Sequence, residues 1–191
     1  MVEFSDVVWP CTGRNNPGGT QTIAYYASIC DFTTIPKVPA SPSILAAAAI
    51  ISDEFNFKPG KGFHKFYSTQ DAGNVKSEGV GEIDGRSFKH MGSLFHPGTE
   101  DEAAGFASSI NNASTIWVIV QADGKKRVIG SEAFPAKITS MVEDSGTKTE
   151  DRKGFSFTLE SKGFTVAPIY TGAIKHKPSN DSSGSGSEID V

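Results

Sequence analysis

Most apolar residues of the chain fall in short runs bounded by glycine, proline or polar turn residues. Residues 20–30, TQTIAYYASIC, are rich in β-branched and aromatic side chains, which are typical of strands. Residues 115–120, TIWVIV, are almost entirely apolar, as in a strand buried on both faces, so we expect Trp117 in the core. Further strands are predicted at residues 63–69, 126–129, 136–142 and 155–160.

Residues 44–51, ILAAAAII, carry two conflicting signals. The four consecutive alanines favour a helix, whereas the closing isoleucines and the alternation at Phe55 and Phe57 favour a strand. We predict a strand. The run is also far shorter than the roughly 20 residues that cross a bilayer, and the first ten residues lack the features of a secretory signal. The sequence therefore predicts a soluble protein made in the cytoplasm.

A long β-hairpin is predicted around Asp84-Gly85, a dipeptide typical of two-residue type I′ turns. The first arm, residues 75–83, has only three large apolar side chains and little with which to build a core. We expect this hairpin to protrude and its exposed first arm to be covered by another chain, because soluble proteins seldom leave strand edges open. The predicted contact residues are Glu78, Glu82, Asp84, Gly85, Arg86 and Lys89.

One helix is predicted at about residues 100–111. Thr99 and Glu102 have the spacing of a capping box, and the acidic residues of this segment suit the positive end of a helix dipole. Apolar residues then recur with helical spacing and should pack against a sheet. These residues are Ala103, Ala104, Phe106, Ala107 and Ile110.

Composition limits both the domain count and the binding partners. With 191 residues, the chain is sized for one domain, and its glycine and phenylalanine content favours a β-rich fold. Lysine and arginine total 18 against 22 aspartates and glutamates, a formal charge of -4, so tight binding to nucleic acid is disfavoured. Residues 1–19 are expected to form an arm or loop, and residues 175–191 a flexible Ser/Gly-rich tail.

No catalytic or metal-binding signature stands out in the sequence. The four histidines are scattered, no HExxH or GxSxG motif is present, and Cys11 and Cys30 match neither a zinc site nor a redox pair. We expect His90 and His96, six positions apart on one predicted strand, to be surface or interface residues. The sequence thus predicts a protein that is not an enzyme and has no cofactor, no metal site and no catalytic residues.

Five segments together resemble the tail tube proteins of tailed phages and prophages of Bacteroidetes bacteria. The resemblance covers roughly residues 20–174 and lies in strands and turns. The segments are Phe95-His-Pro-Gly-Thr-Glu100 followed by Ala103 and Phe106-Ala107, Asp123-Gly-Lys-Lys-Arg-Val-Ile-Gly130, Pro135-Ala-Lys137, Gly154-Phe155-Ser-Phe157 and Ala167-Pro-Ile-Tyr-Thr-Gly172.

This resemblance implies a mainly β subunit, an antiparallel β-barrel or sandwich with one flanking α-helix, that forms stacked hexameric rings. The rings would make a channel for DNA passage during ejection, in a virion tail assembled in the host bacterial cytoplasm. Implied partners are further copies of the chain, the tail terminator, tail-tip or baseplate and tape-measure proteins, and transiently passing DNA, with no membrane. Alternatives are a tail terminator, the inner tube of a contractile tail or injection system, and a β-sandwich that binds a host or carbohydrate.

A DNA-conducting channel should be neutral to negative, because unpaired basic side chains would bind phosphate and add friction. The acids predicted as candidates for the channel lining are Glu54, Glu143, Asp144 and Glu160. The basic residues after the Asp123-Gly124 turn are expected at the rim of the ring, facing acids of another subunit. The candidate charges between subunits are Asp101, Glu102, Lys125, Lys126 and Arg127.

Overall fold

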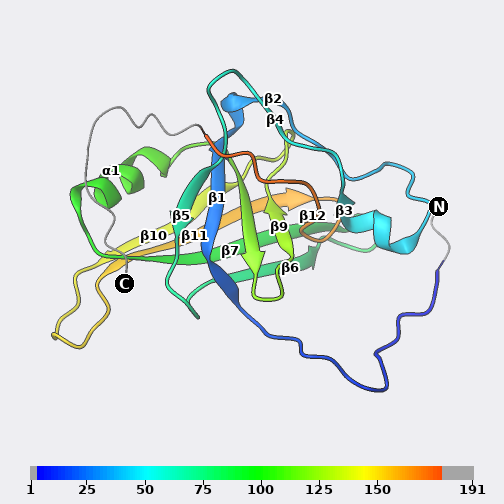
Figure 1. Cartoon of the computed structure of the whole chain (residues 1–191), viewed down its shortest axis with the longest axis horizontal. Coiled ribbons are helices and arrows are strands. Elements are labelled where there is room, and N and C mark those ends of the chain that lie inside the picture. The colour runs from blue at the N-terminus through cyan, green and yellow to red at the C-terminus, as the bar shows by residue number, and fades with distance from the viewer. Residues whose placement is uncertain (1–3, 178–191) are drawn as a thin grey trace, which may run out of the picture.

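The computed structural model describes residues 4–177 and is mainly β, with two β-sheets packed in layers and one α-helix at one end (Figure 1). The strands are β1 (Thr20–Ser28), β2 (Phe32–Thr34), β3 (Ile50–Ile51), β4 (Asn56–Phe57), β5 (His64–Tyr67), β6 (Asn74–Val80), β7 (Ser87–Pro97), β8 (Thr115–Gln121), β9 (Lys126–Ile129), β10 (Lys137–Asp144), β11 (Gly154–Gly163) and β12 (Ile169–Tyr170). The helices are α1 (Asp101–Ile110) and the 3-10 turns η1 (Ile29–Asp31) and η2 (Leu45–Ala49).

The larger sheet has six strands in the order β3-β12-β9-β8-β1-β5, and β8 lies near its centre. Trp117 and Ile119 of β8 point into one hydrophobic cluster, whereas Ile116 and Val118 point into a second cluster on the opposite face. Trp117 is only 1% exposed. The prediction of a strand buried on both faces is therefore confirmed.

The first cluster lies between the two sheets and under α1. Leu94, Phe157 and Leu159 of the smaller sheet contribute to it from one side, and Ala103 and Ala107 of α1 close its end. The second cluster is covered by the short β2–β4 ribbon and its flanking loops, which bring Phe32, Phe55 and Phe63 together. In Figure 1 the strands of the two sheets cross at a steep angle, as in a β-sandwich.

The smaller sheet has four strands in the order β10-β11-β7-β6. All three pairings are antiparallel, and the ladder between β11 and β7 runs without interruption from Gly154–Pro97 to Gly163–Phe88. Among the described residues neither large sheet closes on itself, since each has two end strands. The expectation of a mainly β, sandwich-like fold is thus confirmed, and the barrel form is not seen within one chain.

The hairpin β6–β7 forms as predicted, but its turn and its protrusion were predicted wrongly. Val80 pairs with Ser87, so the connection is a six-residue loop, residues 81–86, instead of a two-residue turn. Asp84 has a φ of 65°, whereas Gly85 does not take a positive φ, as a type I′ turn requires. Both arms belong to the four-stranded sheet, so only the loop extends beyond it.

Three other local predictions also need correction. Most of residues 44–51 forms the 3-10 turn η2, and only Ile50–Ile51 is a strand, because the alanines offer little side chain to pack on a sheet. The N-cap of α1 is Glu100 and no side chain caps it, so the capping box at Thr99 is absent. His90 is buried within the chain at 4% exposure, contrary to the surface or interface position expected for it.

At the carboxyl end, residues 175–177 run beside Phe63. Phe63 donates its N–H to the carbonyl of Lys175, and Lys177 donates to the carbonyl of Phe63. These three residues of the expected tail are therefore part of the fold. The remainder of that expected tail, residues 178–191, lies outside the described residues.

Candidate assembly surface

The outward face of the four-stranded sheet is mostly polar, with apolar exceptions that include Met91 and Val142. Successive strand residues point to opposite faces, and Leu94, Phe157 and Leu159 fix which face is inward. The cross-strand register then places one set of residues on the outward face. The central members of this set are Lys76, Glu78, Lys89, Met91, Ser93, Thr158, Glu160 and Lys162.

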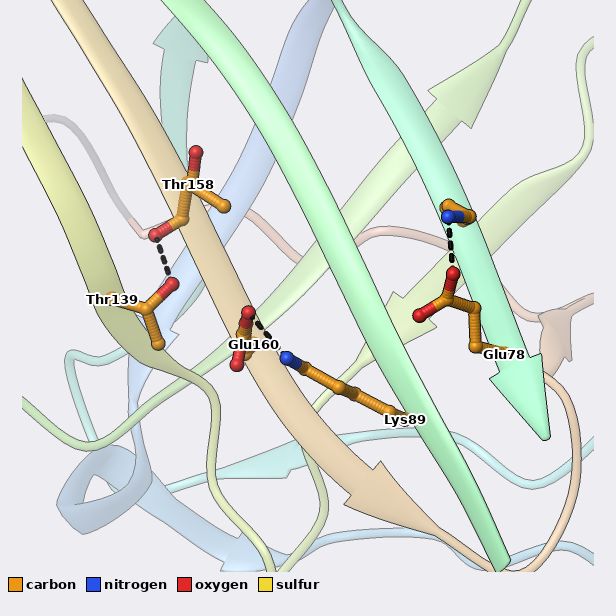
Figure 2. A network of polar contacts seen from close by, with 6 residues as sticks. Glu78, Lys89, Thr139, Thr158 and Glu160 are labelled. Carbon is orange, nitrogen blue, oxygen red and sulfur yellow. Dashed lines mark hydrogen bonds and ion pairs between the residues drawn. The ribbon is translucent and has the colours of Figure 1, made fainter. Parts of the chain in front are cut away.

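Ion pairs join neighbouring positions on this face (Figure 2). Lys89 of β7 lies 2.8 Å from the carboxylate of Glu160 on β11, and Lys76 pairs with Glu78 within β6. The hydrogen bond from Lys76 lowers the pKa of Glu78. Such exposed pairs add little stability, but they neutralise charge locally. Lys162 of β11 has no ion pair among residues 4–177.

A hydroxyl contact extends the polar row to the other edge. Thr139 of β10 donates its hydroxyl to the carbonyl of Thr158, at 3.3 Å, where a register shift lies between Ile138 and Ser140 (Figure 2). The four-stranded sheet therefore has a mostly polar outward face and an apolar inward one.

Two strand edges of this sheet have no partner within the described part of the chain. Strand β6 pairs only with β7, and β10 pairs only with β11. Backbone N–H and C=O groups along both edges are thus available for strand addition. The prediction that β6 is an exposed edge arm is confirmed. The second edge, β10, was not predicted because its place in the sheet depends on the pairing of β11 with β7, which lies far away in the sequence.

The loop of residues 81–86 presents an apolar tip between acids. Ile83 is 83% exposed, and Gly85 donates its N–H to the carbonyl of Glu82 at 3.1 Å. Glu82, Asp84 and Arg86 make no ion pair within residues 4–177. Among the predicted contact residues, these three are therefore free, whereas Glu78 and Lys89 are engaged in the sheet.

A second loop, residues 145–153, projects from the opposite end of the same sheet (Figure 1). The carboxylate of Asp151 accepts the N–H groups of Thr147 and Lys148, at 3.0 and 2.8 Å, so this loop is internally ordered. It also carries Arg152 and Lys153. Sequence reasoning missed this loop, although its run of nine polar residues between two alternating segments was a usable signal.

The structure does not gather the predicted channel acids on one face. Glu160 lies on the outward face, and Glu143 and Asp144 are exposed at the end of β10. Glu54 lies instead in the loop between β3 and β4, where it pairs with Lys175 at 2.7 Å. It belongs to the far side of the six-stranded sheet, so it is not part of this surface.

The predicted charges between subunits fall in two groups. Asp101 and Glu102 are exposed in the first turn of α1. In contrast, the basic residues of the β8–β9 hairpin form ion pairs and hydrogen bonds within the same chain. Lys125 pairs with Asp123 at 2.8 Å and lowers the pKa of that carboxyl by hydrogen bonding. Lys126 binds the carbonyl of Gly172, and Arg127 binds Gln121 and the carbonyl of Ala167.

Residues 4–177 contain no group of three or more histidine, cysteine, aspartate or glutamate side chains placed to hold a metal ion. None of the helices described is long and apolar enough to cross a membrane. Cys11 and Cys30 are free and exposed. Comparison of the chain with protein-family models, with curated proteins and with solved structures finds no match.

Proposed function

We propose that the protein is the subunit of a phage tail tube, and that copies join through the edges of the four-stranded sheet. The observation that carries the proposal is the pair of open edges, β6 and β10, on a sheet with an outward polar face. The resemblance in sequence supports the same function. Tail terminators and the inner tubes of contractile tails or injection systems would use the same edges.

The directions of the two edge strands favour closure of the joined copies into a ring. Because all three pairings are antiparallel, β6 and β10 run in opposite directions. Consider a second copy related to the first by rotation about an axis along the strands. Its β10 would lie antiparallel to β6 of the first copy, so strand direction would keep alternating from copy to copy. A head-to-tail contact of this kind closes into a ring when the rotation divides a full turn.

The expected dimensions suit a DNA channel. Six copies of a four-stranded sheet, with strands about 4.8 Å apart and tilted by roughly 40°, give a barrel of roughly 45 Å diameter. The six-stranded sheet packs against the apolar face of the four-stranded sheet, which leaves the polar outward face of the four-stranded sheet to line the channel. There the Lys76–Glu78 and Lys89–Glu160 pairs would leave few basic groups free to hold phosphate.

Cysteine cross-linking tests the edge contact. In a background with Cys11 and Cys30 replaced by serine, one cysteine on β6, at Lys76 or Glu78, is combined with one on β10, at Ser140 or Val142. All four positions lie on the outward face, so directly opposed residues come within disulfide distance across a paired edge. At least one combination should give a ladder of cross-linked species that ends at the hexamer.

A matched control pairs the β10 cysteine with one at Lys65, an exposed residue on the edge strand β5 of the other sheet. This variant should give no ladder. If none of the four β6–β10 combinations cross-links in assemblies seen by electron microscopy, the proposed edge contact is wrong.

A further inference from the structure

The amino-terminal arm, residues 4–19, carries an exposed apolar segment. Phe4, Val7, Val8 and Trp9 lie within six positions, and their exposed fractions range from 55% to 94%. In Figure 1 the arm (dark blue) runs clear of both sheets before it enters β1. So much adjoining apolar surface in water is unfavourable and marks a site of contact.

The arm is attached firmly at one end only. Gly19 accepts the N–H of Ala122, and Thr20 is buried at the start of β1. Before that point the arm contains Pro10 and Pro17, which cannot donate to a strand ladder or helix. Fifteen residues beyond Gly19, Phe4 can lie about 50 Å away when the arm is extended.

A largely apolar cleft of about 600 Å³ lies elsewhere on the chain. The proline-rich segment of residues 36–42 forms one wall, and the loop of residues 130–134 and the residues after β11 form the other. Phe134 and Phe164 meet edge to face at its rim, with ring centroids 6.0 Å apart, and Phe164 is 82% exposed. An ion pair between Lys37 and Glu132, at 2.8 Å, links the two walls.

The arm and the cleft match in shape and charge. In an extended segment Phe4 and Val8 point to one side and Val7 and Trp9 to the other, so burying both sides needs a cleft with two apolar walls. The volume is in the range that holds several side chains. Asp6 is the one charge between Phe4 and Trp9, and Lys162, which has no ion pair within residues 4–177, lines the cleft.

We propose that residues 4–9 of one copy occupy this cleft on a second copy. A tethered segment would bind its own cleft in preference to another, because the tether gives a high effective concentration, unless the geometry forbids it. In the single chain the segment stays exposed and the cleft open. The proposal stands on these two features alone and does not need the ring contact between β6 and β10.

Tryptophan fluorescence of full-length variants tests the exchange. Trp117 is buried, so a change in emission reports on Trp9. The first variant, Phe4→Asp with Trp9→Asp, has a disabled arm and an intact cleft. The second, Ala133→Glu, has an intact arm and a cleft that carries an added acid beside Glu132. Ala133→Glu alone should lack the blue shift of Trp9 emission expected of the unmodified protein, and adding the first variant, which has no Trp9 and emits only from buried Trp117, should restore it.

A matched control replaces Ala173, an exposed residue that does not line the cleft, with glutamate, and should behave as the unmodified protein. A blue shift in Ala133→Glu alone would place the arm elsewhere, and a mixture that emits as the sum of its parts would exclude exchange between copies. Either result overturns the proposal. Rings that persist in Ala133→Glu would leave the tail tube proposal standing.

Discussion

Gly92 on β7 is a residue at which the two sheets approach closely. A Cβ there would lie 2.8 Å from the Cδ1 atom of Ile129 and 2.9 Å from those of Ile119 and Leu159. We predict that Gly92→Ala lowers the free energy of unfolding by about 1–3 kcal/mol through overpacking. Gly79→Ala on β6, where nothing lies within 4 Å, should change it by less than about 0.5 kcal/mol. Urea unfolding of both variants would show the contrast, and equal losses would contradict it.

His90 is a buried residue whose contacts suit the neutral ring and would be disturbed by mild acid. Its Nε2–H donates to the carbonyl of Thr165 at 2.7 Å, and its Nδ1 faces the hydroxyl of Ser161, which also accepts the N–H of Gly130. This network suits a neutral ring. Burial lowers the pKa of His90 below its ordinary 6.5, so the unfolded chain binds a proton more readily than the folded chain.

Stability should therefore be greatest above pH 6.5 and fall as the pH drops through that value towards the lowered pKa of folded His90. His64, whose pKa is also lowered chiefly by burial, adds to the same trend. We predict that His90→Gln reduces the loss of unfolding free energy between about pH 7.5 and 5.5, as measured by urea titration. The same slope in His90→Gln and in the unmodified protein would contradict this role.

At the scale of elements, the two loops at opposite ends of the four-stranded sheet would meet between stacked rings of the proposed tube. Replacing residues 82–86 with a short Gly-Ser turn removes the exposed Ile83 and no core side chain. We predict an unchanged fold and rings that no longer stack into tubes, as judged by urea unfolding and electron microscopy. Loss of folding would mean that the loop belongs to the core, and normal tubes would mean that it makes no contact.

Elements set by neighbouring residues could be predicted from the sequence, and elements set by distant ones could not. The strand at residues 115–120 and the apolar stripe of α1 could be predicted because the spacing of apolar residues within each segment shows which of its faces are buried. The 81–86 loop was mispredicted because flanking strand register, not the Asp84-Gly85 dipeptide, fixes its length. The Lys89–Glu160 pair and the open β10 edge depend on the strand order, which joins segments far apart in the chain.

At the scale of the whole molecule, the two sheets differ in how much of them is buried. The six-stranded sheet packs against a hydrophobic cluster on each face around β8, and the four-stranded sheet does so on one face only. The four-stranded sheet therefore has one exposed face, and it also has the two edges through which we propose that copies join. Two of its outward lysines, Lys76 and Lys89, are held by the carboxylates of Glu78 and Glu160 in the same chain. A tube lined chiefly by unpaired lysine and arginine would contradict this electrostatic account even if the ring were hexameric.

Electron microscopy of the purified protein tests the central claim most directly, because the claim is one of closed self-association. Grids prepared over a range of protein concentrations, followed by two-dimensional averaging, should show rings with six-fold symmetry and, at higher concentration, hollow tubes of stacked rings. A species that stays monomeric at high concentration, with no rings and no tubes after long incubation, would contradict the account.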